Sequence, residues 1–89
     1  MFEEIDGLLR ASDPARALRL LKQIRPREDV AIEYGWRLGC AQQQLGDLQS
    51  AERSIRNNLQ RNPHHAPSLV TLGQVLLKQG RPFEGSHPA

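Results

Sequence analysis

Residues 32–65 read IEYGWRLGCAQQQLGDLQSAERSIRNNLQRNPHH, and this stretch decides the fold because parts of it recur on both sides. A shift of 34 residues superimposes small, apolar and turn positions without a gap: Leu38 on Leu72, Gly39 on Gly73, Gly46 on Gly80, Ala17 on Ala51, and Leu21 on Ile55. Self-similarity at one fixed period is the signature of a repeat architecture. The sequence therefore predicts a repeat protein.

Each repeat unit is predicted to contain two helices. Gly46-Asp47 supplies the break in the middle unit, because glycine tolerates the left-handed conformation that ends a helix and aspartate caps the next one. Asn62-Pro63 should end the second helix. Apolar residues recur at helical spacing, and the last helix should bury one face formed by Leu69, Leu72, Val75 and Leu76. We expect five helices, at about 2–11, 14–25, 30–45, 48–61 and 67–79.

The middle stretch resembles a tetratricopeptide repeat, whose 34-residue pattern combines W-x2-L-G-x2-Y, a turn glycine, A-x3-F and a proline. The matching structural positions, including those in the flanking units, are Ala17, Leu38, Gly39, Gly46, Ala51, Ile55, Pro63, Leu72, Gly73 and Gly80. Gly35 and Gln42 stand where the pattern has Trp and Tyr. The resemblance implies an all-α fold of antiparallel helical hairpins, stacked as a short right-handed solenoid.

The repeat predicts one domain at residues 1–80, with units at about 1–31, 32–65 and 66–80. Residues 81–89 are expected to be a disordered tail. Gly85 and Pro88 stand where the second helix of the third unit should run, and a proline costs a helix interior about 3 kcal/mol. Only the middle repeat is complete, so the chain is expected to be a piece of a longer protein or to have its end covered by a partner.

Composition narrows the class of protein. The formal net charge of the 89 residues is +2, which is too low to indicate a nucleic-acid-binding protein. The single cysteine, Cys40, has no partner for an internal disulfide, and the N-terminus is acidic where a secretory signal is basic. No stretch approaches the roughly 18 apolar residues of a membrane span. These features predict a cytoplasmic protein.

No enzyme or cofactor motif is found in the sequence. Phosphate-binding glycine loops, the nucleophile elbow and the HExxH zinc motif are all missing. His64 and His65 are adjacent in a turn, and Cys40 lies far from them, so we interpret the pair as loop residues rather than zinc ligands. We expect no catalytic residue, no metal and no cofactor.

In tetratricopeptide repeat proteins the first helix of each unit lines a concave groove. The resemblance therefore implies a partner-binding surface on the first helices of this chain. The groove residues predicted by the 34-residue offset are Phe2, Asp6, Leu9, Glu33, Trp36, Cys40, Gln43, Val70, Gln74, Leu77 and Lys78. Phe2, Trp36 and Val70 form one apolar lane, suited to an extended or helical peptide. The alternative interpretation is that Trp36 fills the hydrophobic core beside Gly35. The lysine and asparagine clamp with which some family members hold a peptide carboxylate is missing.

The second helices place basic residues in columns on the convex side. The column members are Arg19, Lys22, Arg27, Arg53, Arg56 and Arg61. Such columns could attract an acidic ligand or RNA. A solvated helix face is the favoured interpretation, because aromatic stacking residues are missing from it.

Three functions follow. The leading hypothesis is a non-catalytic protein–protein interaction module that binds a peptide or helix in the groove, as an assembly or co-chaperone adaptor. The alternative is the repeat arm or a fragment of a larger enzyme of the sulfotransferase or glycosyltransferase type. The third is acidic-ligand or RNA binding through the convex columns, although nucleic acid is disfavoured. Self-association through the uncapped C-terminal helix is a further expectation.

Overall fold

The computed structural model describes residues 2–80, and the expected tail lies outside the described residues. The described part contains five α-helices and no strand. They are α1 (Glu3–Arg10), α2 (Pro14–Lys22), α3 (Ala31–Gln44), α4 (Leu48–Arg61) and α5 (Ala66–Lys78), with the 3-10 turn η1 (Glu28–Val30) before α3. The predicted all-α fold is confirmed, and α2 ends three residues before the predicted boundary at residue 25.

The turns that follow the first helix of each unit occur at the 34-residue spacing of the repeat. Ser12, Gly46 and Gly80 lie 34 residues apart, and all three have positive φ, at 59°, 86° and 74°. The aspartate after each of the first two turns caps the following helix: Asp13 accepts from the Arg16 amide and Asp47 from the Ser50 amide, both at 3.4 Å. The same chemistry therefore ends α1 and α3 and starts α2 and α4.

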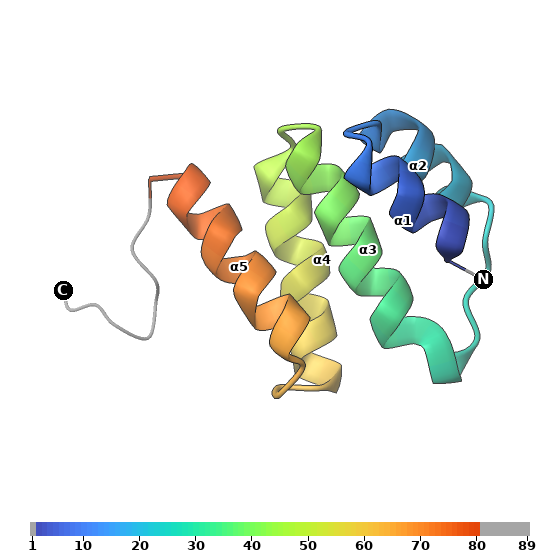
Figure 1. Cartoon of the computed structure of the whole chain (residues 1–89). Helices are drawn as coiled ribbons and strands as arrows, with labels where there is room; N and C mark the ends of the chain where they lie inside the picture. Colours follow the sequence, from blue (N-terminus) through green and yellow to red (C-terminus); the bar gives the residue numbers. More distant parts are fainter. Residues whose placement is uncertain (1, 81–89) are drawn as a thin grey trace, which may run out of the picture.

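The helices form two layers. Figure 1 shows α1, α3 and α5 side by side, with α2 behind α1 and α4 behind α3 and α5. Within the described residues α3 contacts every other helix, and α2 and α4 do not meet. The first helices of the three units therefore share one surface, as the solenoid prediction requires.

The core consists of two clusters on either side of α3. Ile5, Ala17, Leu21 and Ala41 form the first, between α1, α2 and α3. The second contains three residues of α4 and α5, namely Ile55, Leu72 and Leu76. Protein cores are packed with few voids. Because α3 contributes side chains to both clusters, it packs against the helices on both of its sides.

Gly39 lies where α3 and α4 approach closely, whereas the segment that follows α5 and would approach Gly73 lies outside the described residues. A Cβ at Gly39 would lie 2.5 Å from Cδ1 of Ile55, so only glycine lets α3 and α4 meet there. A Cβ at Gly73 would have no atom within 4 Å. Leu69 was also predicted to be buried but is 40% exposed. Ser68 and Thr71 occupy the buried face instead, because polar partners reach them from α3 and α4.

Candidate functional site

A groove lies between α1 and α3 on the surface shared by the first helices. It has a volume of about 340 Å³. Its lining residues are Asp6, Leu9, Arg10, Trp36, Arg37, Cys40 and Gln44. Four of these, Asp6, Leu9, Trp36 and Cys40, belong to the groove set derived from the sequence, and the structure brings them together.

Arg37 lines this groove and was missing from the sequence-based set. Its guanidinium binds both oxygens of Asp6, at 2.7 and 3.1 Å, and a carboxylate oxygen of Glu33 at 3.0 Å. It also stacks 4.4 Å from the ring centre of Phe2 and 5.1 Å from that of Trp36. The expected aromatic lane is thus bridged by a cation whose side chain is only 13% exposed. The spacing of Glu33 and Arg37, i and i+4, was the sequence signal available for this pair.

Trp36 belongs to the groove and to the core. Its indole Nε1–H donates to Thr71 Oγ1 at 3.0 Å, and the ring packs against the cluster formed by Ile55, Leu72 and Leu76. Its other side lines the groove. The two interpretations of Trp36 from the sequence are therefore compatible, and this side chain connects the groove to α5.

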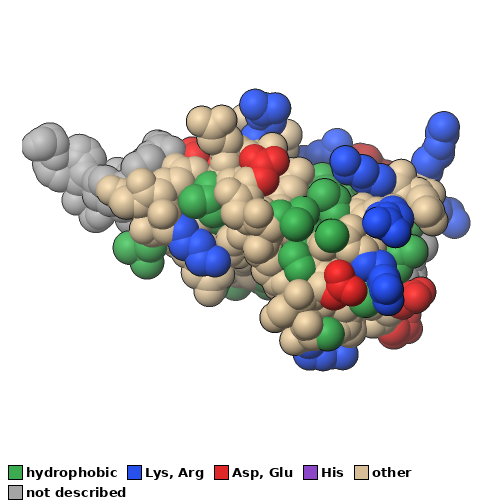
Figure 2. Space-filling model, turned by 90° about the horizontal axis from the view of Figure 1, so that it is seen from above, with side chains coloured by type: hydrophobic (Ala, Val, Ile, Leu, Met, Phe, Trp, Pro, Cys, Tyr) green, Lys and Arg blue, Asp and Glu red, His purple; other side chains and the backbone are tan. Residues whose placement is uncertain are grey.

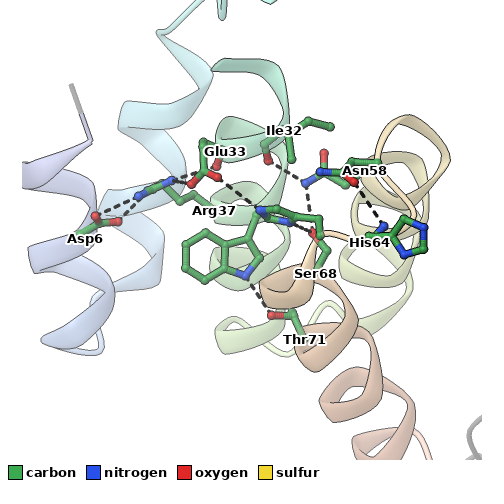
Figure 3. A network of polar contacts seen from close by, with 11 residues as sticks. Asp6, Ile32, Glu33, Arg37, Asn58, His64, Ser68 and Thr71 are labelled. Atoms are coloured by element: carbon green, nitrogen blue, oxygen red, sulfur yellow. Dashed lines mark hydrogen bonds and ion pairs between the residues drawn. The ribbon is translucent and has the colours of Figure 1, made fainter. Parts of the chain in front are cut away.

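A chain of polar contacts continues from the groove across α3 to α5 and α4 (Figure 3). His65 Nε2 lies 3.2 Å from Glu33, and His65 Nδ1 lies 2.7 Å from Ser68 Oγ. Asn58 Nδ2 donates to Ser68 Oγ at 3.3 Å and to the Ile32 carbonyl at 2.7 Å. When the ring proton of His65 is on Nε2, it donates to Glu33, the Ser68 hydroxyl donates to Nδ1, and each of these groups has a partner.

Glu33, His65 and Ser68 are the residue types of a hydrolytic triad, but their placement is structural. Ser68 is fully buried at the base of α5, and its oxygen already accepts from Asn58. A nucleophile must reach a substrate carbonyl and be deprotonated by its base. The Ser68 hydroxyl is covered by α3 and α4, so these contacts instead fix the start of α5.

Cys40 lines the groove as a protonated thiol. Burial raises its pKa, against a smaller lowering by the Thr71 hydroxyl, whose oxygen lies 4.0 Å from Sγ. A raised pKa reduces the thiolate fraction that gives cysteine its reactivity. Cys40 therefore acts as a small packing group between α3 and α5.

The other predicted groove residues lie nearer α5. Gln43 is buried, and its Nε2 donates to Oε1 of Gln74 at 3.4 Å. Val70 and Leu77 are 60% and 76% exposed, and Lys78 is exposed as well. The residues on α5 thus form a separate, open part of the predicted surface.

The predicted basic columns are interrupted by acidic partners. Arg56 pairs with Glu52 at 2.8 Å, and Arg61 lies 3.5 Å from Glu28. Figure 2 shows Lys and Arg side chains interspersed with acidic and apolar ones over the face seen from above. The remaining column members are exposed: Arg19, Lys22, Arg27 and Arg53.

Residues 2–80 contain neither a metal-binding cluster nor a membrane-spanning helix. No group of three or more His, Cys, Asp or Glu side chains is placed to hold a metal ion. None of the helices in this part of the chain has the length and apolar character needed to cross a membrane.

Comparison with known proteins supports the repeat. The chain is 39% identical over 54 residues to tetratricopeptide repeat protein 8 of Caenorhabditis elegans, an alignment that covers 61% of this chain and 11% of that protein. The chain thus spans about one tenth of this relative's length. No family model matches, and no solved structure matches significantly. The similarity, the 34-residue repeat and the paired helices agree on an all-α helical repeat that resembles the tetratricopeptide repeat.

Proposed function

We propose that this chain is a non-catalytic interaction module that binds a peptide or helix of another protein in the groove between α1 and α3. The observation that carries the proposal is the groove of about 340 Å³ on the surface shared by the first helices. In this proposal the module acts as an adaptor in protein assembly or together with a chaperone.

The chemistry of the groove favours a peptide with one apolar and one cationic side chain. Leu9 and Trp36 form an apolar wall. Asp6 and Glu33 supply two carboxylates, both paired with Arg37, and Arg10 lines the groove as a second cation. Glu33 remains half exposed, so it can accept a further cation. Because Arg37 is held on two sides, the walls are rigid before the peptide arrives, which lowers the entropy lost on binding.

Peptides selected from a displayed random library against this chain would test the proposal. Trp36 is the single tryptophan, so its emission reports directly on the groove. We expect selected peptides to shift this emission on binding. Peptides that bind without changing Trp36 emission would place the site elsewhere.

A matched pair of arginine substitutions locates the binding surface. Arg10 lines the groove and Arg19 lies on α2, and both are exposed. Arg10→Glu should change the affinity of selected peptides several-fold, whereas Arg19→Glu should leave it unchanged. If Arg19→Glu has the larger effect, the convex columns rather than the groove bind the partner.

A further inference from the structure

Arg10 is a cation of the groove whose charge is not balanced within the described part of the chain. Arg10 and Arg37 both line the groove. Arg37 is held by Asp6 and Glu33, and its side chain is only 13% exposed. Arg10 is exposed, and it forms no ion pair with any of residues 2–80. The groove therefore presents a positive charge that the described fold does not use.

Asp6 is the partner that the spacing on α1 predicts for Arg10. The two residues lie four positions apart, the separation at which opposite charges on one helix pair. In the structure both carboxylate oxygens of Asp6 instead accept from Arg37, at 2.7 and 3.1 Å (Figure 3). A bidentate contact between a guanidinium and a carboxylate is among the strong charged hydrogen bonds. It joins α1 to α3 and leaves Arg10 without its local partner.

The C-terminal end of α1 does not occupy the guanidinium of Arg10 either. A basic residue in the last turn of a helix can bond the final carbonyl groups. Here the carbonyls of residues 7–9 already accept from the backbone amides of residues 11–13, at 2.8 to 3.2 Å. The side-chain amide of Gln44 also donates to the Leu9 carbonyl, at 3.3 Å. The N–H donors of Arg10 are thus available to a ligand in the groove.

Glu33 carries the opposite charge at the other end of the same surface. Gln44, which contacts α1 next to Arg10, lies eleven positions after Glu33 on α3, or about 16 Å along the helix axis. Trp36 and Cys40 line the groove between these two ends. An extended peptide covers about 16 Å with about five residues. One segment can therefore contact both charged ends and the apolar wall between them.

We propose that Arg10 binds an acidic side chain of the partner segment, about five residues from the cationic side chain that Glu33 accepts. This inference rests on the proposed function, because it specifies the partner of the same groove. A carboxylate is the matching ligand, since the planar guanidinium presents pairs of N–H donors to its two oxygens. The partner is thus a segment with opposite charges at its two ends and an apolar residue between them.

Parallel selections from a displayed random peptide library test the proposal, with wild type, Arg10→Glu and Arg19→Glu as the targets. Peptides selected on wild type should be enriched in Asp or Glu at one position. On Arg10→Glu, Lys or Arg should be enriched at that position instead. Arg19→Glu, on the exposed side of α2 and outside the groove, is the control and should select the acidic residue as wild type does.

The affinity of one peptide selected on wild type measures the contact. The peptide is acetylated and amidated, so that only its side chains carry charge, and its dissociation constant follows from Trp36 emission. Replacing its acidic residue by the corresponding amide should weaken binding to wild type about two- to fivefold. The same replacement should leave binding to Arg10→Gln unchanged. In about 1 M salt the loss on wild type should shrink, because the Debye length falls to about 3 Å. Circular dichroism checks that both Arg10 variants stay helical.

The outcomes separate this inference from the proposed function. Peptides that shift Trp36 emission but share no acidic position, or that keep the acidic position on Arg10→Glu, overturn the inference and leave the proposed function standing. Loss of binding on amidation overturns it as well, because a terminal carboxylate rather than a side chain would then be bound. Selected peptides that leave Trp36 emission unchanged overturn the proposed function and this inference together.

Discussion

Asn58 is a buried amide that connects three helices. From α4 it donates to the Ile32 carbonyl of α3 and to Ser68 of α5, and it packs against Gly35. Asn58→Ala removes both hydrogen bonds and leaves a cavity, so the free energy of unfolding should fall by about 1–3 kcal/mol. Urea unfolding followed by circular dichroism measures this change.

Asn57→Ala provides the matched control for this substitution. Asn57 is the neighbouring asparagine on the same helix and is exposed, so its truncation should change stability by less than about 0.5 kcal/mol. Equal losses from the two variants would mean that helix propensity, rather than the buried contacts, sets the effect of Asn58→Ala.

The sequence could not reveal the role of Asn58. An asparagine in a helix is ordinarily a surface residue, and its partners lie 26 and 10 positions away. The tetratricopeptide pattern has Trp where this chain has Gly35, and Asn58 fills the space beside that glycine. Arg37 escaped prediction for a similar reason, because the offset between repeats compares equivalent positions and Asp6 and Arg37 are not equivalent. Pairing between different positions appears only in three dimensions.

At the scale of elements, Ser12 occupies the turn position that the other two units give to glycine. Its φ is 59°, close to the 86° and 74° of Gly46 and Gly80. A residue with a Cβ pays a steric cost in this conformation. Ser12→Gly should therefore raise the free energy of unfolding by about 0.5–1 kcal/mol, measured by urea denaturation. Ser12→Ala, which keeps the Cβ, should give no gain, and a gain equal to that of glycine would contradict this reasoning.

Two helix glycines should respond in opposite directions to alanine. Gly39→Ala places a Cβ against Ile55 at the α3–α4 contact and should cost about 1–3 kcal/mol. Gly7→Ala in α1 meets no atom within 4 Å and should gain about 0.5–1 kcal/mol from helix propensity. Thermal unfolding of the two variants measures both signs.

The loss at Gly39 should be reversible at its partner. Ile55→Ala removes both atoms that the new Cβ would meet, Cδ1 at 2.5 Å and Cγ1 at 2.7 Å, so Gly39→Ala combined with Ile55→Ala should be less destabilised than the sum of the single variants. Additive effects would show that the two positions do not share this contact.

Element boundaries were predictable because local chemistry sets them. Asp13 and Asp47 cap the helices that follow, and the positive φ at Gly46 ends α3 as its residue type indicates. The side of α5 that is buried was less predictable. Leu69 is exposed and Ser68 is buried, since hydrophobicity marks Leu69 as a core residue while the polar partners of Ser68 come from other helices.

At the scale of the whole molecule, α3 joins two apolar clusters that share no residue. The contacts of Asp6, Arg37, Glu33 and His65 cross the same helix from α1 to the start of α5. The repeat in the sequence predicts the order of the helices. These polar contacts instead depend on side chains that are not repeated at the equivalent positions of the other units. The fold was therefore predictable from period and turns, and the connection between the groove and α5 was not.

Acid should weaken this connection at Glu33. The hydrogen bond from Arg37 holds the pKa of Glu33 below its ordinary value; partial burial acts in the opposite direction, and His65 adds a further lowering. The ionisable groups that face Glu33 are Arg37 on the same helix and His65 before α5, with Asp6 of α1 on the far side of Arg37. As pH falls the unfolded chain takes up the proton first. The contribution of Glu33 is thus complete above the unfolded pKa, about 4.3, and is lost as pH falls through the lower folded value.

Glu33→Gln isolates this contribution. Because Glu33 is half exposed, its ion pair should contribute about 0.2–1 kcal/mol at neutral pH, and the difference in unfolding free energy between wild type and variant should vanish near pH 3. Glu28→Gln is the comparison, since its carboxylate is 85% exposed and lies 3.5 Å from Arg61, so the difference at neutral pH should be smaller. A Glu33→Gln difference that persists unchanged at pH 3 would mean that the shape of the side chain, rather than its charge, supports the junction of α1, α3 and α5.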